Sequence, residues 1–259
     1  MSHAPIEIHG LRKRFGSFDA VTDATFTAAS GRVTGFLGPN GAGKTTTLRI
    51  LLGLMHASEG TALVHGRPYR DHPHPARLVG AVVDIAGAHP RMTARQHLRT
   101  YRALSGVSPK RVDAVLEQTG ATDFADRRIG AFSTGMRQRL ALATALLGDP
   151  EILVLDEPSN GLDPAGIVWL RTFLRHFAAS GRTVLLSSHV LGEVEQTADD
   201  VVLIDRGRVA RTGSLAEIRS SGDSLEDAFL RATQERAAHE RATQNHAAQN
   251  RATQEGVSQ

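Results

Sequence analysis

The hydrophobic pattern of the chain changes from a period of two to a helical period and back again along its 259 residues. Apolar and polar residues alternate around Ile6 and Ile8 and again over residues 24–28, which predicts β-strands within residues 6–28. The apolar run at 152–155, followed by two carboxylates, is typical of a strand buried in a parallel sheet. Other strands are expected at 33–37, 61–64, 79–83, 183–187, 201–204 and 208–210.

Residues 85–150 carry a helical period instead. Thr93 and Gln96 form a capping box ahead of an apolar stripe, and Pro109 marks a second helix start. Ser133 precedes a third stripe at helical spacing. Because this segment interrupts a strand-rich chain, we expect an inserted α-helical subdomain at 85–150 and a core formed by residues 1–84 and 151–215.

The C-terminal part has a pattern of its own, and we expect a helix over residues 216–235. The tetrapeptide Arg-Ala-Thr-Gln begins at positions 231, 241 and 251. This repeat matches neither a heptad nor an eleven-residue supercoil. With few large apolar side chains to bury, residues 236–259 are predicted to be disordered, although their alanine content permits transient helix.

The strand expected at 33–37 leads directly into a glycine-rich loop and then a helix. The loop matches the pattern GxxxxGK[ST]. Its glycines let the backbone bend around a polyphosphate, Lys44 brings a positive charge to the outer phosphates, and the Thr45 hydroxyl can bind Mg²⁺. The residues that we expect to contact the nucleotide are Gly38, Pro39, Asn40, Gly41, Ala42, Gly43, Lys44, Thr45 and Thr46.

Two adjacent carboxylates, Asp156 and Glu157, end the apolar strand at 152–157. The carboxyl ends of parallel strands form the ligand-binding edge of such a sheet. After a phosphate-binding loop, the first acid is placed to hold the Mg²⁺ shell and the second to orient or deprotonate water. The alternative is an ordinary strand end that meets solvent.

Two further residues have two interpretations each. Phe15 is either a core aromatic or a platform on which an adenine ring can stack. His189 follows the strand at 183–187 and so lies at the ligand-binding edge, but an isolated histidine there is more often structural. The residue pattern alone favours the structural role for both.

Composition narrows the classes of function. The chain has no cysteine, which excludes disulfides, thiolate zinc sites and a cysteine nucleophile. Its net charge is +3 with acidic and basic residues interspersed, so charge does not indicate a nucleic-acid partner. The longest nearly apolar run, residues 50–55, is too short to cross a bilayer, and the N-terminus lacks signal-peptide features. We therefore expect a soluble or peripheral cytoplasmic protein.

Over about residues 5–233 the chain resembles the ATP-binding subunit of ABC transporters. The resemblance rests on the order of five features: the phosphate loop, the helical insert, the Ser-Gly helix start, the acidic strand end and the histidine. The resemblance implies ATP and Mg²⁺ as ligands and a P-loop NTPase core with a mixed, mainly parallel sheet, an N-terminal antiparallel β-subdomain and a helical insert. It also implies nucleotide contacts for Phe15, as the A-loop aromatic, and for His189, as the switch histidine. The matching segments are 38–46 (Walker A), 132–136 (signature), 152–157 (Walker B) and 159–163 (D-loop).

Two motifs depart from the family pattern. The signature has Thr134 and Met136 where glycine and glutamine are usual. It keeps Ser133 and Gly135, which the resemblance places against phosphate across a dimer, and this form is similar to exporters of drugs, antibiotics and lantibiotics. The Q-loop position holds Asp84 instead of glutamine; the carboxylate keeps an oxygen ligand but is one methylene shorter, so we expect a bridging water.

The resemblance further implies a homodimer that closes head-to-tail over two Mg·ATP, each signature completing the site of the other copy. Glu157 would polarise the attacking water while Lys44 and His189 stabilise the developing charge. Hydrolysis would drive a separate multi-spanning membrane subunit from the cytoplasmic face. The alternatives are a soluble ABC-type ATPase acting on nucleic acid or ribosomes, which usually has a coiled-coil insert or tandem ATPase domains, and a P-loop kinase, which lacks the signature.

Overall fold

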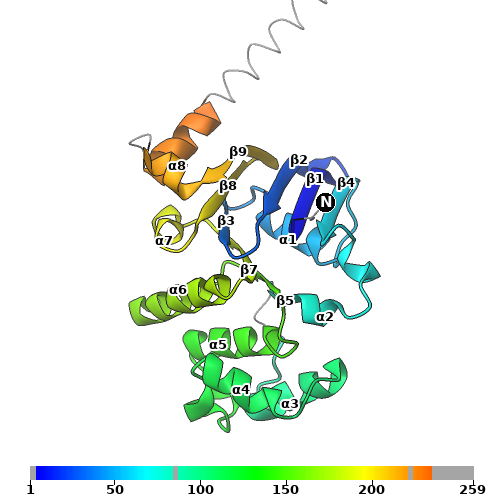
Figure 1. Cartoon of the computed structure of the whole chain (residues 1–259), viewed down its shortest axis with the longest axis vertical. Coiled ribbons are helices and arrows are strands. Elements are labelled where there is room, and N and C mark those ends of the chain that lie inside the picture. The colour runs from blue at the N-terminus through cyan, green and yellow to red at the C-terminus, as the bar shows by residue number, and fades with distance from the viewer. Residues whose placement is uncertain (1–3, 84–86, 221–223, 235–259) are drawn as a thin grey trace, which may run out of the picture.

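The computed structural model describes residues 4–83, 87–220 and 224–234 (Figure 1). Asp84 and the repeat tail at 236–259 lie outside these ranges. Within them the chain forms a mixed nine-stranded sheet with helices packed on it. The predicted α/β class is confirmed.

The sheet has the strand order β4-β1-β2-β9-β8-β3-β7-β6-β5. The neighbours β8, β3, β7, β6 and β5 run parallel, whereas β1 pairs antiparallel with β2 and β4, and β9 with β8. This is the mixed, mainly parallel sheet with an antiparallel N-terminal part that the resemblance implies. The strands are Ile6–Phe15 (β1), Phe18–Ala28 (β2), Val33–Leu37 (β3), Glu59–Val64 (β4), Val79–Val82 (β5), Ile152–Asp156 (β6), Thr183–Ser188 (β7), Asp200–Asp205 (β8) and Arg208–Ser214 (β9).

Strand β6 shows how the sheet separates two hydrophobic cores. Its residues Leu153 and Leu155 belong to the core that contains α6 (Pro164–Ala179). Ile152 and Val154, on the opposite face, belong to the core that contains α1 (Lys44–Leu51). Burial on both faces explains why this strand has a continuous apolar sequence.

Three helices follow β5 in the chain and precede β6, and they gather in the lower, green part of Figure 1. Thr93 and Gln96 form the expected capping box, and Ser133 caps the third helix. The layer meets the sheet closely, because a Cβ built on Gly80 of β5 would lie 2.3 Å from the carbonyl oxygen of Ala145. The helices are Ala94–Ser105 (α3), Arg111–Gln118 (α4) and Thr134–Ala145 (α5).

The remaining helices are short. The expected helix at 216–235 corresponds to α8 (Leu215–Ser220) and to helical residues 225–234, on either side of residues 221–223, which are not described. Within the ranges given above, no helix is long and apolar enough to cross a membrane. The others are Pro75–Leu78 (α2), Leu191–Glu195 (α7) and the 3-10 turns Tyr69–Asp71, Thr122–Phe124 and Ile129–Ala131.

Candidate active site

Three neighbouring strands bring the predicted site residues to one edge of the sheet. β7 lies between β3 and β6, where Ser187 stands opposite Asp156 and Ser188 opposite Leu37. Since the strands are parallel, the segments that follow their carboxyl ends meet at the same edge. The phosphate loop after β3, the acids after β6 and His189 after β7 are thereby placed together.

Backbone contacts hold the phosphate loop in shape. The carbonyl of Ala42 accepts the N–H of Gly207 at 3.0 Å, in the turn between β8 and β9. Gly43 precedes α1 with a φ of 102°, and a Cβ there would lie 2.5 Å from a carbonyl oxygen of β2. Gly41 has a φ of 80° with open space at its Cβ position. The loop therefore requires glycine for close packing at 43, whereas at 41 the positive φ favours glycine.

Lys44 lies within this loop and is only 6% exposed. Its Nζ donates to the carbonyl oxygens of Gly38 at 2.7 Å and Pro39 at 3.2 Å. The same Nζ lies 3.2 Å from Oε1 of Glu157. A buried ammonium needs such partners because an unpaired charge is costly to remove from water. This cation therefore joins the phosphate loop to the second acid that follows β6.

Thr45 and Asp156 place two oxygen donors beside the loop. Thr45 Oγ1 donates to Asp156 Oδ2 at 2.7 Å, and Ser187 Oγ donates to Asp156 Oδ1 at 2.5 Å. Mg²⁺ prefers oxygen ligands and is usually bound by one or two carboxylates together with phosphate oxygens. The hydroxyl and the carboxylate, next to a loop shaped for phosphate, fit a nucleotide-bound Mg²⁺.

Glu157 has a left-handed backbone conformation, with a φ of 48°. Its N–H donates to Ser187 Oγ at 3.0 Å, and its Oε2 lies 2.8 Å from His189 Nδ1. Non-glycine residues adopt this conformation mainly where surrounding contacts enforce it, which is frequent at active sites. The side chain is 18% exposed, so the carboxylate is held between Lys44 and His189 while water can still reach it.

Ser187 is a site residue that the sequence patterns do not single out. It is fully buried, and its hydroxyl bonds to both Asp156 and the backbone of Glu157. Its sequence signal is weak, because a serine at the end of a strand usually meets solvent. The stronger signal is topological: a buried hydroxyl needs a partner, and the strand that ends in two acids lies next to it.

We expect Ser187→Ala to lower the rate of the ATP hydrolysis that the resemblance implies about tenfold or more, since the variant leaves the Glu157 N–H unpaired and removes a donor from Asp156. Steady-state hydrolysis, with nucleotide affinity measured in parallel, checks this. Ser188→Ala is the matched control, because Ser188 is also buried, but its hydroxyl accepts the N–H of Val190, and its contact with the N–H of Gly38 is made by the backbone carbonyl, which the substitution keeps. Equal losses in the two variants would contradict a specific role for Ser187.

Phe15 ends β1 and is 45% exposed, so the core interpretation is wrong. Lys13 Nζ lies 5.0 Å from its ring centroid, and Phe18 stands opposite it at the tip of the β1–β2 hairpin. The same hairpin packs on the phosphate loop, where Val21 Cγ2 would be 3.2 Å from a Cβ on Gly43. An exposed ring on this hairpin supports a platform for the base.

The signature residues do not join this cluster. Ser133 Oγ accepts the N–H of Met136 at 3.3 Å at the start of α5, and Gly135 lies beside Leu162 in the segment after β6. Figure 1 shows α5 in the lower layer, apart from α1 and the loop before it. Asp84, expected to serve the Mg²⁺ site through a bridging water, lies outside the described residues.

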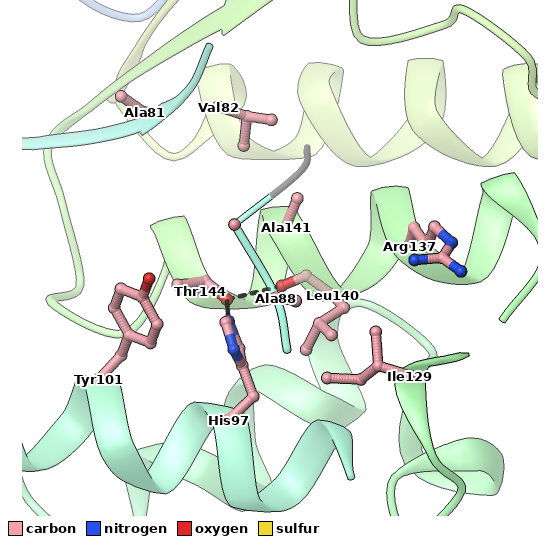
Figure 2. Close-up of a pocket in the computed structure, with 11 residues that line it drawn as sticks. Ala81, Val82, Ala88, His97, Tyr101, Ile129, Arg137, Leu140, Ala141 and Thr144 are labelled. Carbon is pink, nitrogen blue, oxygen red and sulfur yellow. Dashed lines mark hydrogen bonds between the residues drawn. The ribbon is translucent and has the colours of Figure 1, made fainter. Parts of the chain in front are cut away.

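A cavity of about 190 Å³ lies between α3, α5 and the end of β5, and none of its lining residues belongs to the phosphate site (Figure 2). His97 Nε2 lies 3.2 Å from Thr144 Oγ1 in this cavity. The Thr144 hydroxyl already donates to the carbonyl of Leu140 at 2.9 Å, so Nε2 of His97 carries the hydrogen and donates to Thr144. Burial lowers the pKa of His97 below its ordinary value.

This lowered pKa predicts a loss of stability in mild acid. Below the ordinary histidine pKa of about 6.5, the unfolded chain binds a proton at His97 that the folded chain does not bind. The free energy of unfolding therefore decreases as the pH is lowered from about 6.5 to the pKa of His97 in the folded chain. We expect His97→Gln to have a flatter profile than the parent chain between about pH 6.5 and 5 in denaturant titrations. His56→Gln, at an exposed position, serves as the control, and a parental slope in His97→Gln would contradict the assignment.

Comparison with known proteins agrees with this geometry. A family model described as ABC transporter matches residues 21–160. The Nod factor export ATP-binding protein I of Burkholderia lata is 40% identical over 221 residues, covering 83% of this chain and 72% of that protein. The bacitracin transport ATP-binding protein BcrA of Bacillus licheniformis is 39% identical over 207 residues, covering 79% and 68%. A solved ATP-binding subunit of an ABC transporter superposes with a TM-score of 0.79 at 28% identity, covering 89% of this chain and all of that one.

The fold and the site define a P-loop ATPase of the ABC type. The chain belongs to the ABC transporter family, as an ATP-binding subunit whose relatives include ATP-binding proteins named for bacitracin transport and Nod factor export.

Proposed function

We propose that this chain hydrolyses ATP to power export through a separate membrane subunit. The observation that carries the proposal is the continuous set of contacts at the sheet edge. Lys44 links the phosphate loop to Glu157, Glu157 contacts His189, and Thr45 contacts Asp156. Each group has the chemistry that one part of phosphoryl transfer to water requires.

The residues divide the work in the following way. The loop N–H groups and Lys44 bind the phosphates, while Phe15 supports the base. Thr45 and Asp156 would hold Mg²⁺, which when bound would neutralise charge on the phosphate oxygens. Glu157 accepts a proton from the attacking water, and His189 Nδ1, 2.8 Å from Oε2, orients this carboxylate.

A second copy of the chain completes the site. The start of α5 carries the exposed residues Ser133 and Thr134, yet it lies apart from the phosphate loop of its own chain. Helix N-termini favour phosphate groups. A head-to-tail pair of chains brings each α5 to the phosphate loop of the other copy, so two composite sites form in one dimer. One chain alone binds ATP but hydrolyses it poorly.

Export of an antibiotic, a peptide or a related drug is the transport reaction that we propose. It rests on the names of the relatives and on the signature Ser-Thr-Gly-Met at 133–136. In this function the chain is attached to the cytoplasmic face of the membrane through a multi-spanning permease. Co-purification of the full chain with such a permease, retained in detergent and encoded beside it, tests this part of the proposal.

The head-to-tail arrangement can be tested by disulfide cross-linking, because the chain contains no cysteine. We expect a 1:1 mixture of Asn40→Cys and Ser133→Cys chains to form a cross-linked dimer when ATP is added under mild oxidation. Neither variant alone should do so, since like residues lie at different composite sites. The parent chain should also lose specific ATPase activity on dilution. Cross-links within either single variant, or constant activity on dilution, would contradict the arrangement.

A further inference from the structure

The segment that joins the catalytic acid to α6 is a tight turn. Asn160 N–H donates to the carbonyl of Glu157 at 3.2 Å, and Leu162 N–H donates to that of Ser159 at 3.0 Å. Gly161 has a φ of 74°, and Asp163 caps α6 by accepting the N–H of Gly166 at 2.7 Å. The turn, residues 157–163, therefore has a defined shape between two fixed ends, β6 and α6.

This turn packs against the beginning of α5. A Cβ built on Gly161 would lie 2.8 Å from Cγ2 of Thr134, a separation that real side chains do not show. One residue further along each segment, a Cβ on Gly135 would be 3.6 Å from Cδ2 of Leu162. The Thr134 methyl group thus occupies the space that glycine leaves at position 161.

Contacts further along the two helices keep α5 and α6 together. The guanidinium of Arg139, in α5, lies 3.9 Å from the ring centroid of Trp169 in α6, and Trp169 stacks on Phe173. Arg139 also donates to the carbonyl of Thr119 at 2.8 Å. Because the helices are fixed by these larger groups, the Thr134–Gly161 contact determines only how the turn lies against the first residues of α5.

We infer that Thr134 is a positioning residue, whose methyl group fits against Gly161 and sets Ser133 and Gly135 relative to Glu157 of the same chain. The inference rests on the proposed function, in which Ser133 and Gly135 act on the partner's phosphate loop while Glu157 acts in the chain's own site. The contact then links the two composite sites through one chain. It also gives a reason for glycine at position 161, because a Cβ there would overlap the Thr134 methyl group unless Thr134 moved.

The fit is tested by moving the side chain from one segment to the other. Gly161→Ala should lower the ATPase turnover about tenfold, because its Cβ displaces Thr134 and the signature behind it. Thr134→Gly should cause a smaller loss. In the double variant Thr134→Gly/Gly161→Ala the overlap is gone, so its turnover should exceed that of Gly161→Ala alone. Independent effects would instead make the double variant the least active of the set.

Gly181→Ala is the control for backbone strain, because Gly181 also has a positive φ, 88°, but has open space at its Cβ position. This variant should share any loss of thermal stability with Gly161→Ala but keep the parental turnover. ATP affinity of the dilute chain should stay within about twofold in the whole set, since the phosphate loop is untouched. The rescue should appear both in the turnover and in the ATP-dependent cross-link between residues 40 and 133.

Two results would overturn the inference: a double variant no more active than Gly161→Ala, or a rescue seen in thermal stability and absent from turnover and cross-linking. The second result would mean that the contact exists but positions nothing for catalysis. Failure of the proposed function would give a different set of results. There the 1:1 mixture of Asn40→Cys and Ser133→Cys chains, with no other substitution, shows no ATP-dependent cross-link, and the parent chain loses no specific activity on dilution.

Discussion

Glu157→Gln is expected to reduce ATP hydrolysis by about 100-fold or more while ATP binding persists. The amide keeps the size and one hydrogen-bonding oxygen of the carboxylate, but it cannot accept a proton from water, and general-base catalysis contributes on the order of 10²–10⁴-fold. The phosphate loop keeps its glycines and Lys44. The variant should therefore form the ATP-bound dimer and remain in it, because the bound ATP is not hydrolysed.

Phosphate release and size-exclusion chromatography with ATP measure the two halves of this expectation. The variant should elute as a dimer with ATP and as a monomer with ADP. Glu151→Gln is the matched control, because Glu151 is exposed just before the same strand, β6, and its carboxylate lies 3.3 Å from the ring of His65, away from the site. Hydrolysis by Glu157→Gln at the parental rate would remove Glu157 from the catalytic role.

The sequence predicts well those features that depend on contiguous residues. The phosphate loop is read from one stretch, and the strand at 152–157 is recognised because burial on both faces leaves an uninterrupted apolar run. Even so, the loop pattern treats its glycines alike, whereas the structure separates them. Gly43 is required by packing against β2, and Gly41 borders open space.

Features that depend on sheet order are not visible in the sequence. Ser187 acquires its role because β7 lies between β3 and β6, an order that no local pattern specifies. Phe15 illustrates the same limit. The residue pattern favours burial of this aromatic side chain, and only its place at the tip of the β1–β2 hairpin shows that it is exposed.

Contacts between residues of two different motifs are also not visible in the sequence. Thr134 departs from the family pattern in the signature, and Gly161 lies 27 positions later in the D-loop segment. The two become one feature only when α5 and the turn after β6 pack together. The same holds for the charge balance of the site, since Lys44 and Glu157 belong to motifs on different strands and are joined by a 3.2 Å contact.

That contact leads to an expectation for Lys44→Ala, which should weaken ATP binding about 100-fold or more. The ammonium is 6% exposed, and a charge-assisted contact of a buried cation with phosphate is worth roughly 3 kcal/mol, or about two orders of magnitude in affinity. The substitution also removes the donor shared by the carbonyls of Gly38 and Pro39, so the loop loses part of its support. Lys44→Arg should not restore binding, because a planar fork does not fit the enclosed position of a compact ammonium.

Titration calorimetry of the dilute chain with Mg·ATP measures the effect, and circular dichroism verifies that the variant is folded. Lys110→Ala is the control, since Lys110 is one of the chain's three lysines and lies exposed at the start of α4.

The two substitutions separate the role of Lys44 in binding phosphate from the role of Glu157 in hydrolysis. Glu157→Gln should bind ATP and not turn it over, whereas Lys44→Ala should fail at binding. If Lys44→Ala retained parental affinity and lost only turnover, Lys44 would act on Glu157 alone and the phosphates would be bound by the backbone.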